Sequence, residues 1–256
     1  MLGLTPQDSP HHSTGLVESL TCAMPARPHR SPYGEEFFSG LDRSSSSSAG
    51  EIVPLLVALT RCKSVVDVGC GTGHWVRAFM DSGVLDVLGV DGDYVHERKL
   101  RVPRSAFAAW DLSRPLRLGR QFDLCLCLEV AEHLLPKCAA RFVASLVSLA
   151  PVVVFSAAIP GQGGTHHVNE QWPSYWVNLF ERHGFMASDC IRPRIWSNPK
   201  VAWWYAQNML LFVSPKHDLQ VEAVRLALIN KRWGMIDVVH PRGRAWPWPC
   251  PAGRGP

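Results

Sequence analysis

Residues 64–75 constrain the fold more than any other part of the chain. Their first five residues, SVVDV, form an apolar run rich in valine, which is typical of a buried parallel strand. Glycines follow at positions 69, 71 and 73, and because glycine has no Cβ, the backbone can approach a ligand closely there. Apolar residues then recur at helical spacing until Gly83, where we expect a helix to end. The segment therefore predicts the strand, glycine turn and helix that open a nucleotide-binding βαβ unit.

Apolar runs of strand length alternate with helical patterns along most of the chain. Further strands are expected at residues 86–91, 105–112, 122–128, 152–156, 185–191 and 206–213. Helices are expected at residues 51–59, 136–149, 171–183 and 218–234. The serine run at 44–48 is expected to be flexible, with Ser47 or Ser48 capping the helix that follows. This alternation predicts a doubly wound, Rossmann-like α/β fold.

The chain divides into one predicted domain and two flanking segments. Residues 1–44 begin with a stretch rich in proline, serine and histidine, which predicts disorder, and aromatic residues near its end predict partial order there. Residues 45–240 form the predicted domain, and 256 residues with 46% hydrophobic content suit one sizeable core. Residues 241–256, rich in proline and glycine, are expected to be disordered.

Composition argues against several classes of protein. The net charge of +4 is mild and no dense stripe of lysine and arginine is present, so a nucleic acid is not the expected partner. The eight cysteines are scattered, without the paired spacing of a zinc site, and are expected to be free thiols. No secretory signal is recognisable, and the longest apolar run, at residues 149–160, is too short to span a membrane. We therefore expect a soluble, cytoplasmic protein.

The residues around the glycine turn indicate which nucleotide binds. A dinucleotide site needs a third glycine five residues after the first, and His74 stands there instead. No lysine follows the glycines, which excludes a phosphate-binding P-loop. Asp67, two residues before Gly69, would repel a pyrophosphate but suits a ligand that carries an ammonium group. Asp91 ends the second strand at a distance suited to ribose, and Asp111 ends the third strand beside the expected base. Together these residues indicate S-adenosylmethionine.

At these positions the chain resembles the class I S-adenosylmethionine-dependent methyltransferases. The likeness covers residues 64–215 and is carried by residues 67–73, 91, 111–112 and 122–129. It implies a seven-stranded sheet with the last strand antiparallel, helices on both faces, and the cofactor over the carboxyl ends of the first four strands. Transferred residue by residue, it implies a cofactor site made of Asp67, Gly69, Gly71, Gly73, Asp91, Asp111, Leu112 and Glu129.

A second group of chemically active residues follows the fourth strand. The segment EVAEH places Glu129, Glu132 and His133 on one face if the turn is helical. Carboxylates with an imidazole suit a divalent cation such as Mg²⁺ or Mn²⁺. The glycine-containing loop after the fifth strand lies at the same edge of the sheet and could supply a fourth ligand from His166, His167, Asn169 or Glu170. We therefore consider Glu129, Glu132, His133 and His167 as metal ligands, although such residues can also simply brace a cofactor pocket.

The same Glu-x-x-Glu-His motif resembles two groups of methyltransferases. One contains the ubiquinone-biosynthesis O-methyltransferases and the other the small-RNA 2′-O-methyltransferases, and both are associated with a divalent metal. In the second group a downstream histidine completes the site, and His166 or His167 is placed to match it. The chain has neither a basic surface nor an RNA-binding module, which makes RNA the less favoured acceptor.

These observations predict an O-methyltransferase that acts on a small-molecule hydroxyl, such as that of a sugar or secondary metabolite. His133, His166 or His167 is the expected general base. The alternatives are an RNA 2′-O-methyltransferase and a non-catalytic, S-adenosylmethionine-binding regulatory subunit. The aromatic residues between positions 172 and 205 either pack in the core or line an acceptor pocket. The sequence leaves the methylated atom and the oligomeric state open.

Overall fold

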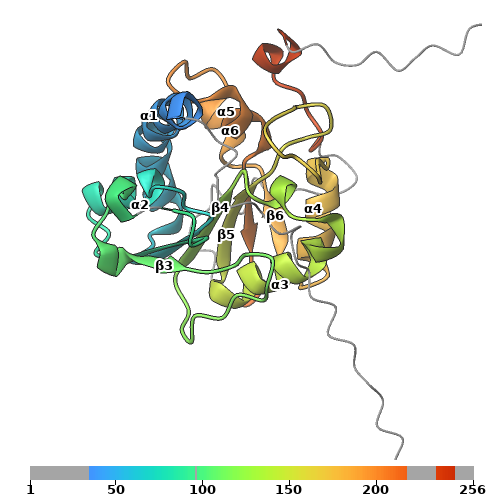
Figure 1. Ribbon diagram of the computed structural model, residues 1–256. Helices are drawn as coiled ribbons and strands as arrows, with labels where there is room; N and C mark the ends of the chain where they lie inside the picture. Colours follow the sequence, from blue (N-terminus) through green and yellow to red (C-terminus); the bar gives the residue numbers. More distant parts are fainter. Residues whose placement is uncertain (1–34, 96, 218–234, 246–256) are drawn as a thin grey trace, which may run out of the picture.

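A seven-stranded sheet forms the centre of the protein. The computed structural model describes residues 35–95, 97–217 and 235–245 (Figure 1). The strands are β1 (Ser64–Val68), β2 (Asp86–Asp91), β3 (Phe107–Ala109), β4 (Leu124–Leu128), β5 (Val152–Ser156), β6 (Met186–Ser188) and β7 (Leu210–Val213). Their order is β3-β2-β1-β4-β5-β7-β6, and β7 is antiparallel to both of its neighbours, β5 and β6. The other pairings are parallel, which confirms the predicted sheet.

Helices cover both faces of this sheet (Figure 1). They are α1 (Glu35–Thr60), α2 (His74–Asp81), α3 (Ala139–Leu149), α4 (Pro173–Glu181), α5 (Arg192–Ile195) and α6 (Trp203–Asn208). Side chains alternate along β4: Leu124 and Leu126 join the core with α1 and α2, while Cys125 and Cys127 join the core with α3 and α4. The predicted doubly wound arrangement is therefore confirmed.

Helix α1 differs most from the prediction. It begins at Glu35 and continues through the serine run and Pro54 to Thr60, so the expected boundary after residue 44 falls inside a helix. Ser47 and Ser48 do not cap it. The Ser47 hydroxyl donates to the Lys200 carbonyl (2.8 Å), and the buried Ser48 hydroxyl accepts from the Ala202 amide (3.0 Å). The predicted flexibility was wrong because contacts with a distant segment hold these serines in the helix.

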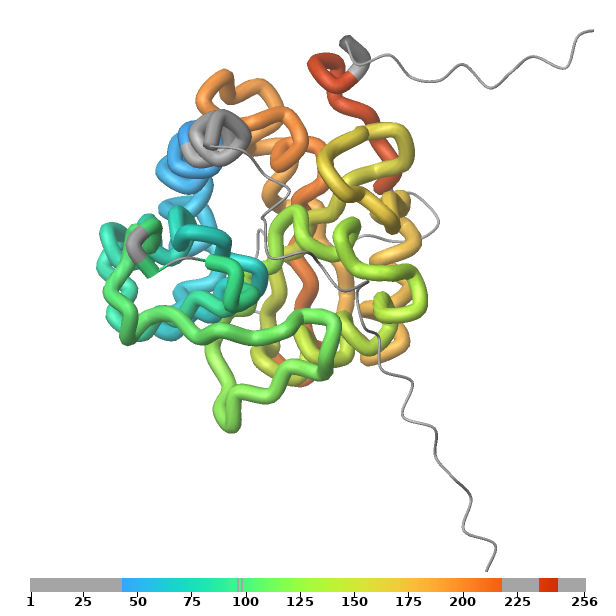
Figure 2. The backbone as a smooth tube through the Cα atoms, in the orientation of Figure 1, coloured from blue at the N-terminus to red at the C-terminus, as the bar shows by residue number. Residues whose placement is uncertain are grey.

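Residues 235–245 pack against the domain beside α4 (Figure 2). The Ser174 amide donates to Asp237 (2.9 Å), and Pro241–Ala245 forms a short 3₁₀-helix in which Gly243 lies against the Trp203 ring. The disorder predicted from residue 241 was thus wrong for these five residues. Residues 1–34, the expected helix at 218–234 and residues 246–256 lie outside the described part. No helix within that part has the length and apolar character needed to cross a membrane.

Six cysteines lie in the described part of the chain, and five of them agree with the sequence analysis. Five are buried free thiols, at positions 62, 70, 125, 127 and 190. Burial raises the pKa of the Cys127 thiol well above its usual value, so these groups serve as core side chains. Cys138, in the 3₁₀ turn before α3, is disulfide-bonded, so the prediction of a free thiol was wrong there.

Candidate active site

The glycine turn joins β1 to α2 and requires glycine on steric grounds. Gly69, Gly71 and Gly73 have φ values of 85°, 55° and 92°, in the left-handed region that side chains disfavour. A Cβ on Gly69 would lie 2.2 Å from Cγ2 of Val130, so the turn lies directly against the segment after β4. The Gly69 amide donates to the Val90 carbonyl (2.7 Å) at the end of β2. The turn is thus fixed between the ends of two neighbouring strands.

Two buried carboxylates lie beside this turn. The Oδ2 atom of Asp91 accepts from the Gly71 amide (2.7 Å), and its Oδ1 accepts from the Gly92 amide (2.6 Å) and from the Tyr94 hydroxyl. The Oδ2 atom of Asp67 is buried and makes no hydrogen bond to any residue in the described ranges. Burial raises the pKa of Asp67 well above its usual value, and the nearby Asp91 charge adds to this increase. An unsatisfied buried carboxylate is costly, so Asp67 is suited to receive a ligand that brings donors or positive charge.

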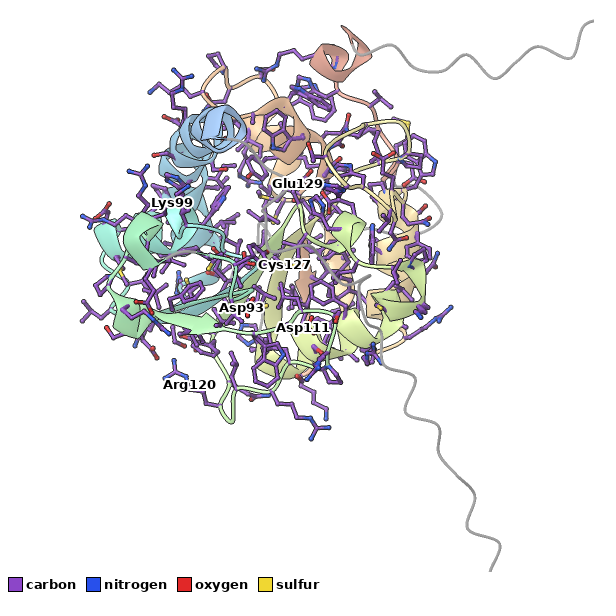
Figure 3. All side chains as sticks on the ribbon, viewed as in Figure 1. Asp93, Lys99, Asp111, Arg120, Cys127 and Glu129 are labelled. Carbon is purple, nitrogen blue, oxygen red and sulfur yellow. The ribbon has the colours of Figure 1, made fainter. Side chains whose placement is uncertain are left out.

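Asp111 and Leu112 follow β3 at the same edge of the sheet. The Asp111 side chain is 54% exposed; its Oδ1 accepts from the Ser113 amide (2.9 Å) and hydroxyl (2.6 Å), and its Oδ2 pairs with Arg114 (3.3 Å). Leu112 is partly buried against the core that includes α3 and α4. Figure 3 shows Asp111 and Asp93 on the β3 side of the site and Glu129 on the side nearer α5 and α6.

Glu129 lies apart from the other residues of the EVAEH segment. Its φ is 53°, and the helical turn after it is a 3₁₀ turn at Ala131–His133, so the predicted shared helical face was wrong. The Gln162 side-chain amide donates to Oε2 of Glu129 (3.0 Å), and the Asn208 amide donates to Oε1 (3.2 Å). Burial raises the pKa of Glu129, and these hydrogen bonds partly oppose the increase. Glu129 therefore belongs to an amide network with Gln162 and Asn208.

Glu132, His133 and His167 form a compact cluster. One ligand atom from each lies within 4.8 Å of the others, and the two imidazole rings are 5.0 Å apart at 83°. Glu132 is fully buried; neither of its carboxylate oxygens receives a well-formed hydrogen bond from the residues that the structure describes, and the backbone N–H groups of Glu132 and Ala158 are the donors that favour its charged form. Burial raises the pKa of Glu132 well above its usual value, and the Glu129 charge raises it further. A buried carboxylate beside two imidazoles is a donor set that fits a divalent cation.

The loop between β5 and α4 places one of its two adjacent histidines, His167, in the cluster with Glu132 and His133. The Val168 and Asn169 amides donate to the Glu132 carbonyl (2.8 and 3.0 Å), which holds the loop against the cluster. His167 is partly buried there, whereas His166 has a φ of 61°, is exposed and lies outside the cluster. Of the three candidate bases, the structure therefore brings His133 and His167 together.

Three residues near the site were missed by the sequence analysis. Gln162 stands between two glycines of the loop, and Tyr94 follows Asp91 by three residues. Asn208 is the last residue of α6, two positions before β7 begins. Only the position of Gln162, in a loop already predicted to be functional, offered a signal. Two of the predicted aromatic residues pack in the core: Trp176 lies with α3 and α4, and Tyr205 contacts Trp75 of α2 edge-on at 5.2 Å.

The strand order with an antiparallel β7, the glycine turn after β1 and the acid ending β2 define a class I S-adenosylmethionine-dependent methyltransferase. The chain belongs to a family described as a methyltransferase domain, whose model matches residues 21–189. No curated protein matches the chain.

Several solved structures are similar to the chain. DesVI from Streptomyces venezuelae is 25% identical with a TM-score of 0.43, and the match covers 51% of this chain and 58% of DesVI. The methyltransferase domain of bacterial CtHen1-C is 17% identical with a TM-score of 0.49, covering 66% of this chain and 98% of that one. Magnesium protoporphyrin IX methyltransferase from Synechocystis PCC 6803, with bound S-adenosylmethionine, is 17% identical with a TM-score of 0.49, covering 73% and 87%. The chain thus spans just over half the length of DesVI.

Proposed function

We propose that the protein transfers the methyl group of S-adenosylmethionine to a hydroxyl group of a small molecule, such as a sugar or secondary metabolite, with the help of a divalent cation. The observation that carries this proposal is the cluster of Glu132, His133 and His167, in which the Glu132 carboxylate is fully buried and receives no well-formed hydrogen bond from the described residues. The cluster follows β4, which pairs with β1, the strand that leads into the glycine turn, and β5, which lies on the other side of β4. A reaction between the cofactor and a second molecule requires two such neighbouring sites.

The cofactor half of the proposal rests on residues at the ends of β1 to β4. Asp67 would receive the ammonium group of the methionine portion, above the turn of Gly69, Gly71 and Gly73. Asp91 would bind the ribose hydroxyls, and Asp111 with Leu112 would contact the adenine. The unsatisfied Oδ2 of Asp67 and the contact of Asp91 with the Gly71 amide support this assignment. Glu129 would contact the cofactor at the boundary between the two sites.

The acceptor half rests on the cluster after β4 and β5. Glu132, His133 and His167 would hold Mn²⁺ or Mg²⁺, and two imidazoles beside one carboxylate favour Mn²⁺. A bound cation would lower the pKa of the acceptor hydroxyl and orient it toward the methyl group. Without a cation, the neutral imidazole of His133 or His167 is close enough to the same region to remove the hydroxyl proton. Glu129 would be a further ligand only if its carboxylate gave up its hydrogen bonds from Gln162 and Asn208.

Replacement of Glu132 by Gln tests the proposal. We expect Glu132→Gln to lose at least tenfold in Mn²⁺ affinity and in turnover on hydroxyl acceptors, because a neutral amide replaces an anionic ligand. Calorimetric S-adenosylmethionine binding should remain unchanged. His166→Ala, which alters an exposed histidine of the same loop, serves as the matched control. Full turnover and wild-type Mn²⁺ binding by Glu132→Gln would disprove the assignment.

Two outcomes would change the acceptor class. Tight RNA binding that weakens steeply with salt would redirect the proposal to a ribose 2′-hydroxyl of RNA, because phosphate contacts release counterions. S-adenosylmethionine binding without turnover over a broad acceptor panel would favour a regulatory subunit. Both measurements use the full chain.

A further inference from the structure

Glu170 lies behind the metal-ligand cluster and has no role in the proposed ligand set. Its side chain is 20% exposed. The Oε1 atom accepts from the Gly163 amide (2.8 Å) and lies 2.9 Å from Nδ1 of His167, while Oε2 accepts from the Gly161 amide (2.8 Å). One carboxylate thus contacts three nitrogen atoms of the same loop.

These contacts determine which nitrogen of His167 carries the proton. An ionised carboxylate can only accept hydrogen bonds, so the neutral imidazole must carry its proton on Nδ1 to bond with Glu170. Nε2 then keeps its lone pair. This lone pair is what accepts a proton or binds a cation. The two glycine amides fill other acceptor positions of the carboxylate and keep it from rotating away.

The loop around His167 is closed by contacts that leave little freedom for the ring. Gly164 lies against the imidazole, because a Cβ there would come within 2.3 Å of Nε2. The Gln171 amide donates to the Ala158 carbonyl (3.1 Å), which joins the two ends of the loop. Glu170 therefore acts on a ring whose position is already constrained, and its specific contribution is to the tautomer and orientation.

We propose that Glu170 is a positioning residue: its carboxylate holds the His167 imidazole in the Nδ1–H form, which leaves the lone pair of the ring on Nε2. What Nε2 does rests on the proposed function, but the tautomer itself does not. In metal sites such a carboxylate behind a histidine typically changes metal affinity 10–100-fold.

The tautomer can be measured directly by long-range ¹H–¹⁵N correlation spectra of the metal-free, full-length protein, with His167→Gln to assign the signals. The spectra are recorded at alkaline pH. We expect a protonated Nδ1 and an unprotonated Nε2. An Nε2–H form in the wild-type protein would overturn the proposal without any variant of Glu170.

Glu170→Gln sharpens this measurement. A glutamine offers one acceptor and one donor group, so it cannot accept from both glycine amides and from Nδ1–H, and we expect the His167 signals to shift toward the Nε2–H form. Glu97→Gln removes the same charge from an exposed position and should leave the spectrum unchanged. An unchanged tautomer in a folded Glu170→Gln protein would contradict the proposal.

Mn²⁺ titration followed by electron paramagnetic resonance separates this inference from the proposed function. If both are correct, Glu170→Gln binds Mn²⁺ 10–100-fold more weakly and Glu97→Gln binds it normally. If the wild-type protein binds no Mn²⁺ but His167 shows the expected Nδ1–H form, the metal proposal fails and the positioning role of Glu170 stands. If Mn²⁺ binds equally well to the wild-type protein and Glu170→Gln, the positioning role fails and the metal proposal stands.

Discussion

The two halves of the site are built in different ways. In the cofactor half, the residues that interact are close in sequence: the Gly71 amide and the Asp91 carboxylate are 20 positions apart, and each acid ends its own strand. In the acceptor half, Glu129 binds Gln162 at a separation of 33 positions and Asn208 at a separation of 79. The first half follows from short strand–turn units, whereas the second exists only after β4, β5 and β7 have paired. We therefore expect changes to the turn to affect the whole site and changes to single carboxylates to affect one half.

Gly69→Ala should have the largest effect because Gly69 lies where the two halves meet. Its Cβ would lie 2.2 Å from Val130, and its φ of 85° is unfavourable for alanine. Steric strain and backbone strain together should lower the free energy of unfolding by about 2–5 kcal/mol, measured by urea denaturation. Gly71→Ala is the matched control, because it has φ 55° but nothing within 4 Å, and it should lose only about 1–2 kcal/mol. Equal losses for the two variants would show that Val130 does not limit the turn.

The buried carboxylates should give the ligand-free protein an unusual pH dependence. The pKa of Asp67 and that of Glu132 are raised in the folded state, so the folded chain keeps protons that the unfolded chain has released. The free energy of unfolding should therefore increase as the pH falls from about 8 toward the unfolded pKa values of about 4. Each carboxylate adds up to about 1.4 kcal/mol per pH unit inside its own window.

Variants show how much the cofactor half and the acceptor half each contribute to this dependence of the free energy of unfolding on pH. Asp67→Asn should remove the contribution of the cofactor half and Glu132→Gln that of the acceptor half. Asp111→Asn, at an exposed carboxylate, should change nothing. Denaturation curves between about pH 5 and 8 measure the slopes. A slope that is unchanged in Asp67→Asn would mean that Asp67 is already neutralised by a neighbouring group.

Tyr94→Phe should have the smallest effect, confined to the cofactor half. The Tyr94 hydroxyl donates to Oδ1 of Asp91, the carboxylate expected to bind ribose, and Tyr94 is 52% exposed. Removing this competing donor should tighten S-adenosylmethionine binding by about 2–10-fold, since a hydrogen bond contributes about 0.5–1.5 kcal/mol net. Calorimetry provides the measurement, and Mn²⁺ binding should not change. Weaker cofactor binding in Tyr94→Phe would indicate that the hydroxyl contacts the cofactor instead.

The meeting of the glycine turn with Asp91 could be predicted from the sequence. The glycines reveal their own backbone requirement, and Asp67 and Asp91 mark the ends of valine-rich strands, so their meeting follows from parallel pairing. The metal-ligand cluster was predicted in part: Glu132, His133 and His167 come together as expected. Glu129 departs from them because its left-handed backbone turns it away from the 3₁₀ turn and toward Gln162 and Asn208.

Elsewhere, tertiary contacts overrode local signals. The serine run reads as flexible in isolation, yet it is helical because Ser47 and Ser48 bond to residues 200–202. Residues 241–245 read as a loose tail, yet Gly243 lies against Trp203. In both places the partner is too far along the chain for a local pattern to indicate it.

The sequence by itself determined the class of fold and the place of the glycine turn, because hydrophobic periodicity and glycine conformation act over a few residues. Only the tertiary structure decided how the acceptor side is arranged: which of two adjacent histidines joins Glu132, and that Glu170 holds its ring. The physical reason is loop closure. His166 and His167 are equivalent in sequence, and the contacts of the Val168 and Asn169 amides with the Glu132 carbonyl bring one of them inward and leave the other exposed.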